Sequence, residues 1–375
     1  MNYPLVVATR LAYKGVIKRI FFLQDPEAVH RKMTAMGKRL GASKAARSTL
    51  AAIFRREYPE LKQSLLGIDF KGPLGLAAGF DYEARLTQIL PSMGFGFGTV
   101  GTLTNEPYGG NPLPRLGRLP RSRSLMVNKG FKNLGVQATL EDLKEKKFEY
   151  PVGVSIGKTN TKNIKMQGQG VADVVNGFRK AEASLVPFAY YELNISCPNL
   201  VGSVEFYESE HLEELLKALG ELKLSRPMFV KMPISKTDAE IISIMDVVVR
   251  YPFVKAAIFG NLQQNRNDPA IIPAEAKKFE RGNWSGMPCQ KRSDELIRLA
   301  FKKYGARITI IGCGGTFSAK DAYRKIKLGA SLVQLITGMI FEGPQLIAEI
   351  NAGLVKLLKK DGFGNISEAV GKGAL

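Results

Sequence analysis

From residue 70 onward, short apolar runs alternate with longer stretches of amphipathic, helix-like pattern. Helical periodicity follows most of these runs, as in His211–Leu222 and Asp238–Arg250. Eight such units predict an α/β fold of the (β/α)₈ or TIM-barrel type, in which parallel strands close into a barrel inside a ring of helices. The expected strands are Leu74–Phe80, Phe95–Thr104, Val152–Lys158, Tyr190–Ser196, Met228–Pro233, Ala256–Asn261, Ile308–Gly315 and Leu332–Gly338.

A doubly wound open sheet is the competing α/β arrangement. Eight units without a dinucleotide-binding fingerprint are unusual for that architecture. The nearest candidate, Gly94-Phe95-Gly96, lies inside an expected strand and does not open a helix. The pattern therefore favours the barrel.

The first twenty residues have the pattern of a basic amphipathic helix. Leu5, Ala8, Ala12, Val16 and Ile20 share one face, and the basic residues at positions 10, 14 and 18 lie opposite. A helix of this kind can lie in a membrane interface, or it can pack its apolar face on its own domain. The pattern alone leaves both alternatives open.

Two further helices are expected before the barrel. Asp25-Pro26-Glu27 has the features of an N-cap and first turn, and its helix should run to Leu40. A third helix is expected at Ser48–Arg56. We therefore expect a helical module over residues 1–62 and the barrel domain over residues 63–375.

The segment Asn105–Lys132 interrupts the strand–helix alternation. It has little helical periodicity and is rich in Gly, Pro and Arg. Connections of this length are usually functional or carry structure of their own. We expect either a functional loop or a small hairpin insertion.

The charge balance points to polyanionic partners. The net charge is +20, and residues 1–60 hold twelve Lys or Arg against four Asp or Glu. Such an excess favours nucleic acid or an anionic membrane face, although a solvated basic surface is the plainer interpretation for any one residue. No apolar run is long enough to predict a membrane-spanning helix.

The cysteines and histidines predict neither a metal site nor a disulfide framework. Cys197, Cys289 and Cys313 are widely spaced and show no CxxC pattern, and the chain has only two histidines. We expect no metal.

Residues at the carboxyl ends of the expected strands predict a cofactor site, because chemistry in this fold lies there. Gly314, Gly315 and Gly338 lie at the carboxyl ends of the last two expected strands, where bare backbone N–H groups can close on a phosphate. Lys231 ends the fifth strand and can offer a cation to a cofactor. With strand-end amides such as Asn194, the set indicates a phosphate-bearing cofactor lying against a planar polar substrate.

Cys197 is the candidate catalytic residue. It lies between Asn194 and Asn199, beside Pro198, at a strand end. A thiol can act as a general base if its surroundings lower its pKa; the alternative is an inert buried thiol. Cys289 and Cys313 are expected to be structural.

The chain resembles the dihydroorotate dehydrogenases, and specifically their membrane-associated, quinone-using class 2. The resemblance covers nearly the whole chain. The matching motifs are Phe22-Leu23-Gln24-Asp25-Pro26-Glu27-Ala28-Val29-His30, Gly75-Leu76-Ala77-Ala78-Gly79-Phe80-Asp81, Pro114-Arg115-Leu116, Gly130-Phe131, Asn194–Asn199, Ser285-Gly286 and Gly329-Ala330-Ser331-Leu332-Val333-Gln334.

The resemblance implies an FMN-containing barrel that oxidises dihydroorotate to orotate in pyrimidine synthesis, with Cys197 as the base. His30 and Arg118 match residues that line a quinone tunnel. Substrate contacts are expected from Asn128, Lys129, Gly130, Phe131, Asn194, Asn199 and Asn261. Flavin contacts are expected from Ala78, Gly79, Thr102, Ser155, Asn194, Lys231, Gly286, Gly314, Gly315, Thr337 and Gly338.

Several positions depart from the family's pattern. The class normally has Ser in place of Cys197, Lys in place of Tyr82 and Asn in place of Val127. Leu262 stands where the class usually has Thr. Ser155 stands where it usually has a flavin-contacting Asn. Either Lys129 replaces the lost cation, or the substrate is a different dihydropyrimidine.

Two other functions compete with this one. A tRNA-dihydrouridine synthase-like enzyme is also a flavin barrel with a catalytic cysteine, and a basic barrel without catalysis would bind membrane or nucleic acid. The motif Asn194–Asn199 is typical of the dehydrogenase and favours that function. We therefore expect no nucleic acid partner, a monomer or weak dimer, and peripheral association with the inner face of a membrane, the cytoplasmic membrane if the source is bacterial.

Overall fold

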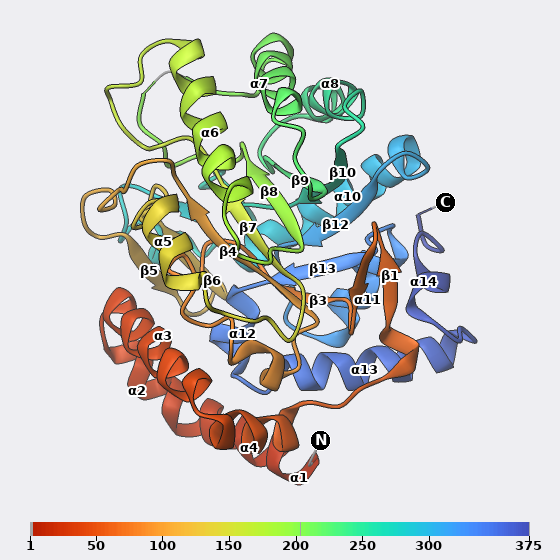
Figure 1. The fold of residues 1–375 in the computed structure, drawn as a ribbon. Coiled ribbons are helices and arrows are strands. Elements are labelled where there is room, and N and C mark those ends of the chain that lie inside the picture. Colours follow the sequence, from red (N-terminus) through yellow and green to blue (C-terminus); the bar gives the residue numbers. More distant parts are fainter. Residues whose placement is uncertain (1–2, 203, 375) are drawn as a thin grey trace.

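The computed structural model describes residues 3–202 and 204–374. Eight parallel strands close into a barrel in the order β10-β12-β13-β3-β4-β7-β8-β9, which confirms the expected fold (Figure 1). The strands are β3 (Leu74–Leu76), β4 (Phe97–Leu103), β7 (Val152–Ile156), β8 (Tyr190–Asn194), β9 (Met228–Met232), β10 (Val254–Phe259), β12 (Thr309–Cys313) and β13 (Leu332–Leu335).

Helices surround the barrel, as the amphipathic stretches predict. Between β3 and β4 there is only a 3₁₀ turn, Leu90–Met93. The main helices are α5 (Val136–Leu143), α6 (Gln167–Glu182), α7 (Ser209–Glu221), α8 (Asp238–Val248), α10 (Gln290–Tyr304), α11 (Ala319–Lys327) and α13 (Leu346–Asp361). Shorter helices are α9 (Pro273–Ala276), α12 (Thr337–Glu342) and α14 (Ile366–Ala369), with 3₁₀ turns at Pro59–Leu61 and Met287–Cys289.

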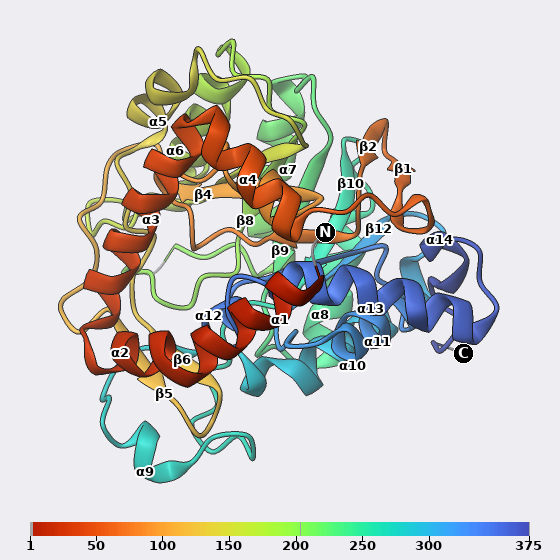
Figure 2. The same cartoon turned by 90° about the horizontal axis from the view of Figure 1, so that it is seen from below.

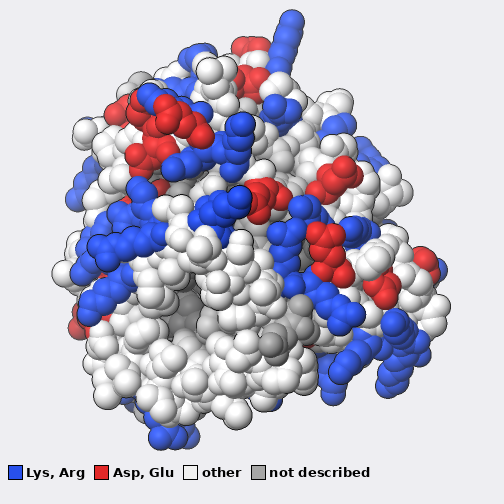
Figure 3. Space-filling view, turned by 60° about the horizontal axis from the view of Figure 1, so that its bottom comes forward, with Lys and Arg blue, Asp and Glu red and all other residues white. Residues whose placement is uncertain are grey.

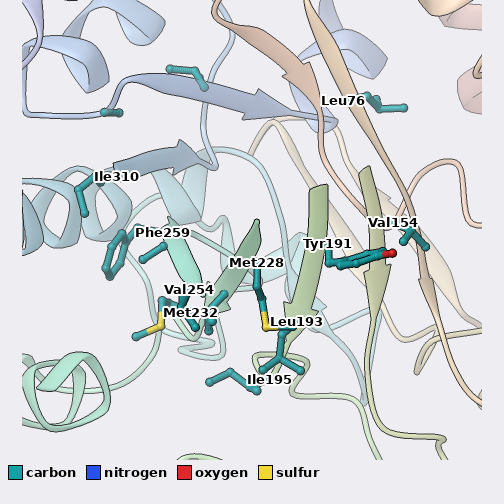
Figure 4. Packing of buried hydrophobic residues seen from close by; sticks show 14 of the residues in the cluster. Leu76, Val154, Tyr191, Leu193, Ile195, Met228, Met232, Val254, Phe259 and Ile310 are labelled. Carbon is teal, nitrogen blue, oxygen red and sulfur yellow. The ribbon is translucent and has the colours of Figure 1, made fainter. Parts of the chain in front are cut away.

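Alternation along the strands decides which side chains enter the barrel. On β8, Tyr191 and Leu193 pack outward in the main hydrophobic cluster, together with Met228 (Figure 4). Tyr190 belongs to the inner cluster and stacks on Phe229, with ring centroids 4.3 Å apart. Because side chains alternate with a period of two, the inward positions farther along β8 and β9 are those that reach the carboxyl-end opening of the barrel.

The expected hairpin insertion is present in the segment Asn105–Lys132. Strands β5 (Leu116–Leu119) and β6 (Ser124–Val127) are antiparallel. Strand β11 (Asn283–Trp284), distant in sequence, adds to β6 and completes a three-stranded sheet. A separate hairpin, β1 (Gln63–Leu65) and β2 (Ile68–Phe70), precedes the barrel and packs on its inner cluster.

The N-terminal helices form an open arc across one end of the barrel (Figure 2). Helix α1 (Tyr3–Ala12) continues through a π-helical segment, Tyr13–Ile17, into α2 (Lys18–Leu23), and α3 (Pro26–Ala42) and α4 (Lys44–Phe54) follow. The Asp25 side chain accepts a 2.7 Å hydrogen bond from the backbone of Ala28, as its expected N-cap role requires. The domain boundary after residue 62 stays a prediction.

The apolar face expected of the first helix points away from the protein. Its five residues are all exposed, with Val16 at 59% and Ile20 at 50%. The helix docks instead through buried Val6, which packs with Phe54, and through Tyr13, whose hydroxyl donates a 2.6 Å hydrogen bond to the Ile340 carbonyl. The alternative that this face packs on its own domain is therefore wrong. No helix within the described residues is long and apolar enough to cross a bilayer.

Candidate active site

One continuous cavity of about 730 Å³ joins the carboxyl ends of the barrel strands to the N-terminal helices. Its inner part is lined by polar residues from the strand ends. Its outer part is lined mainly by apolar side chains of α2, α3 and the π-helical segment, including Ile17, Phe21, Phe22, Val29 and Met33. Figure 3 shows a hollow on this face of the molecule, surrounded mostly by uncharged residues.

The cavity floor carries Asn194 and Lys231, at inward positions of neighbouring strands β8 and β9. The Asn194 amide donates a 2.7 Å hydrogen bond to the hydroxyl of Thr102, which lies 2.9 Å from the Ser155 hydroxyl. Lys231 is 3% exposed. Four expected flavin contacts are therefore adjacent, although Ser155 lies behind Thr102 and does not line the cavity.

Glycines form the cradle expected for a phosphate. Gly314 and Gly315 have φ of +101° and +67°, which suits residues without a Cβ. A Cβ on Gly338 would overlap the Thr316 carbonyl oxygen. The Thr316 hydroxyl is buried and has no partner within the described residues, so this cradle leaves a polar group for a ligand. The other expected flavin contacts, Ala78, Gly79, Gly286 and Thr337, also line the cavity.

The amides expected to bind substrate are held in place by neighbours. Asn199 donates to the Val127 carbonyl at 3.1 Å and accepts from Asn283 at 2.7 Å. Asn261 donates to the Ser196 hydroxyl. These contacts fix Asn199 and Asn261 at the cavity wall, where a ring bearing carbonyl and N–H groups can meet both donors and acceptors.

The remaining expected substrate residues follow β6. Lys129, Gly130 and Phe131 line the cavity. Asn128 does not; its amide oxygen accepts a 3.0 Å hydrogen bond from Asn111. Asn128 therefore holds the loop after β6 in place through Asn111 and does not face the cavity. Ser155 is placed in the same way, next to Thr102 and outside the cavity lining.

Cys197 lies on the wall of the same cavity and is partly buried. Burial raises the pKa of its thiol to about 12, while the Asn199 backbone and the Lys231 cation oppose the rise. The lowering that would favour a general base is thus not present in this arrangement. Cys197 and Asn194 also border a second cavity of about 50 Å³, which Lys158 and Tyr207 line.

The other two cysteines are closer to the site than sequence reasoning suggests. Cys289 and Cys313 are buried and both line the main cavity. The Cys289 thiol donates to the carbonyls of Asn261 and Trp284 at 3.1 and 3.2 Å. The sequence gives no signal that Cys289 contacts Asn261, because this contact depends on how the loops after β10 and β11 meet.

His30 and Arg118 both line the apolar part of the cavity. Arg118 donates a 2.6 Å hydrogen bond to the Gln24 carbonyl, and its guanidinium lies 4.9 Å from the centre of the Phe22 ring. His30 is bonded to the Phe80 carbonyl at 2.8 Å, and burial lowers the pKa of its imidazole to about 3. Residues 3–202 and 204–374 contain no cluster of three or more His, Cys, Asp or Glu that could hold a metal.

Comparison with known proteins identifies the family. The family model for dihydroorotate dehydrogenase matches residues 60–358, which is most of the chain. The chain belongs to the dihydroorotate dehydrogenase family. The resemblance carried by the motifs is thereby confirmed, and the tRNA-dihydrouridine synthase alternative loses its support.

Individual members of the dihydroorotate dehydrogenase family match over nearly their whole length. A dihydroorotate dehydrogenase (quinone) of Trichodesmium erythraeum is 32% identical, covering 96% of this chain and 98% of that protein. A dihydroorotate dehydrogenase (quinone) of Sulfurovum sp. is 34% identical, covering 95% of this chain and 97% of that protein. The crystal structure of the Eimeria tenella dihydroorotate dehydrogenase in complex with ferulenol has a TM-score of 0.80 at 26% identity, covering 92% of this chain and 95% of that one.

Apart from Ser155, the positions that depart from the dihydroorotate dehydrogenase pattern lie along one cavity. Tyr82, Val127 and Leu262 all line the main cavity, as does Lys129. The Lys129 ammonium donates a 3.0 Å hydrogen bond to the Tyr82 hydroxyl. The two unusual residues are therefore in contact, which sequence spacing alone does not reveal.

Proposed function

We propose that this protein oxidises dihydroorotate to orotate with bound FMN and passes the electrons to a quinone, as a step of pyrimidine synthesis. The observation that carries the proposal is the single cavity that joins a polar floor beside Cys197 to an apolar mouth between α2 and α3. Such a cavity can hold a polar ring at its floor and an apolar electron acceptor nearer its mouth.

The residues present suit FMN. The glycine cradle offers backbone N–H groups to a phosphate. Lys231 and Asn194 offer polar contacts to a flat polar ring on the floor. When bound, FMN supplies the acceptor for a hydride and the route for two electrons to the quinone.

Cys197 acts as the base in this proposal. Its thiolate takes a proton from C5 of dihydroorotate while a hydride leaves C6, so the ring loses two hydrogens and gains a double bond. Asn194, Asn199 and Asn261 orient the ring through its carbonyl and N–H groups. Because burial raises the pKa of Cys197, the thiol must lose its own proton before this step.

The outer face of the N-terminal helices suits peripheral association with an anionic membrane. Leu11, Val16, Ile20 and Leu23 are exposed by 50% or more. Lys and Arg outnumber Asp and Glu twelve to four in residues 1–60, which favours anionic headgroups. A membrane on this face would lie against the apolar mouth of the cavity, from which a quinone would enter. We propose a monomer or weak dimer on the inner face of the membrane, the cytoplasmic one if the source is bacterial.

Anaerobic titration of the purified flavoprotein tests the function. L-dihydroorotate should bleach the flavin absorbance, and a soluble quinone should restore it. Dihydrouracil, which has the same ring without the carboxylate, serves as the comparison. A flavin that stays oxidised with dihydroorotate would overturn the proposal.

Vesicle co-sedimentation tests the membrane face. Replacing Leu11, Val16 and Ile20 together with Ser should reduce binding to anionic vesicles by at least about tenfold, because each buried aliphatic side chain contributes about 1.5–3 kcal/mol. Leu185→Ser is the matched control, since Leu185 is 92% exposed but lies after α6. Equal binding of the triple variant and the control would contradict the proposed orientation.

Oxidation of a different dihydropyrimidine is the second candidate. Tyr82, Val127 and Leu262 favour it, because they place aromatic and aliphatic groups where the family has polar ones. Faster bleaching by dihydrouracil than by dihydroorotate would establish this alternative.

A further inference from the structure

Lys129 is a buried cation at the junction between the N-terminal helices and the barrel. It follows β6, is 8% exposed and lines the main cavity. Its ammonium donates a 3.0 Å hydrogen bond to the Tyr82 hydroxyl and lies 4.2 Å from the centre of the Tyr82 ring. Three separate elements therefore meet at this group: α3, the turn after β3 and the turn after β6.

The hydrogen bonds around Tyr82 form a chain in which each group donates to the next, from Lys129 through Tyr82 and His30 to the Phe80 carbonyl. The Phe80 carbonyl can only accept, so His30 Nε2 carries the proton of the 2.8 Å bond between them. The neutral ring then leaves Nδ1 as an acceptor, and the Tyr82 hydroxyl, 3.4 Å away, donates to it. The Tyr82 oxygen is thus free to accept from Lys129. This contact orients the ammonium but provides no negative charge.

Nearby carboxylates are already paired. Glu27 is bonded to Arg115 at 3.0 Å and to Lys132 at 3.2 Å. Glu83 pairs with Arg85. Within the described residues, Lys129 has no ion-pair partner. A buried cation without a counter-charge is costly.

The cavity itself offers no counter-charge either. None of the residues that line it is Asp or Glu. Five of them are basic: Lys32, Arg118, Lys129, Lys132 and Lys231. An anion that enters this cavity therefore brings the missing charge with it.

We propose that Lys129 binds the carboxylate of the substrate and selects anionic pyrimidines over neutral ones. This inference rests on the proposed function. The amides of Asn194, Asn199 and Asn261 suit the ring's carbonyl and N–H groups, which leaves the carboxylate for a cation. Lys231 lies on the floor beside Asn194 and is an expected flavin contact, which leaves Lys129 as the buried cation of this cavity that has no ion-pair partner among the described residues.

Proton uptake follows from this assignment. Burial lowers the pKa of Lys129 to about 7, and an adjacent carboxylate would raise it again. Above pH 7 the free protein must take up a proton to bind the anion, so affinity should fall by up to about tenfold per pH unit. Tyr82 and His30 stay neutral over this range, with pKa values of about 12 and about 3. The charged groups that face Lys129 are Glu27, Glu83, Arg115 and Lys132, with Arg85 beyond Tyr82.

Ligand binding to the oxidised flavoprotein tests the inference without turnover. Orotate and uracil, the same ring with and without the carboxylate, are titrated against the flavin absorbance of wild type and Lys129→Met. Loss of a charged hydrogen bond should weaken orotate about 10- to 100-fold and leave uracil within about threefold. Lys32→Met, which removes another cavity-lining cation, is the matched control and should leave both ligands within about threefold.

The wild-type pH dependence provides a second measurement that needs no variant. Orotate affinity should fall above pH 7, while uracil affinity stays level. Equal orotate affinity in wild type and Lys129→Met, or a level orotate profile, would overturn this inference alone. A wild-type flavoprotein that binds no orotate would overturn the proposed function as well.

Discussion

Glu27 links the N-terminal helices to the barrel insertion, and its removal should loosen that junction. Its side chain is 4% exposed and is bonded to Arg115 at 3.0 Å and Lys132 at 3.2 Å. Glu27→Gln would leave two cations facing each other without a carboxylate. Removing one partner of a buried ion pair costs about 3–5 kcal/mol. Since Arg115 and Lys132 can turn toward water, we expect about 2–4 kcal/mol here.

Glu57 is the matched control, because it has the same chemistry at the surface. It is bonded to Arg55 and Lys62, each at 3.0 Å, but is 48% exposed. Exposed pairs contribute about 0–1 kcal/mol. Glu57→Gln should therefore lower the free energy of unfolding far less than Glu27→Gln, although each variant removes the carboxylate that pairs with two cations.

Thermal unfolding near neutral pH measures both effects. About 2.1 cal/mol/K per residue gives the chain an unfolding entropy of about 0.8 kcal/mol/K. The expected loss in Tm is thus about 3–5 °C for Glu27→Gln and about 1 °C or less for Glu57→Gln. Equal shifts in the two variants would refute the reasoning from burial.

The pH dependence of the Glu27 effect has a definite sign. Burial raises the pKa of Glu27. The hydrogen bonds and positive charges of Lys132 and Arg115 together lower the pKa by more than burial raises it, so the net shift is downward. Its contribution is fully present above the ordinary glutamate pKa of about 4.3 and is lost as the pH falls through the lower folded value. The gap between wild type and Glu27→Gln should therefore narrow as the pH falls below the ordinary glutamate pKa.

Three further predictions concern the active site. Cys197→Ala should retain flavin but bleach at least about 100-fold more slowly with dihydroorotate, which stopped-flow absorbance measures; normal bleaching would remove Cys197 as the base. Since burial raises the pKa of Cys197 to about 12, the wild-type bleaching rate at saturating substrate should rise about tenfold per pH unit between about pH 7 and 9; a plateau there would mean that the thiol ionises lower. Gly338→Ala should lower the flavin content of the purified protein, because the added Cβ overlaps the Thr316 carbonyl; full occupancy would show that the cradle can adjust.

The barrel and the helical module could be predicted from the sequence because their signals are local. A strand buried on both faces is a short apolar run, and a helix repeats its apolar positions every 3.6 residues. The cap at Asp25 depends only on residues three positions apart. The strand-end residues of the site, such as Asn194 and Lys231, follow from the fold, since the barrel brings the carboxyl ends of its strands together.

What only the tertiary structure decided is which groups meet across distant segments. The direction of the first helix's apolar face depends on Val6 and Tyr13 finding partners elsewhere in the chain. The contact between Tyr82 and Lys129 joins residues 47 positions apart. The pKa of Cys197 is set by the burial of the thiol, which no sequence pattern encodes. Periodicity fixes the elements because it acts along the chain; burial and charge pairing act through space, so they are settled only when the elements are packed.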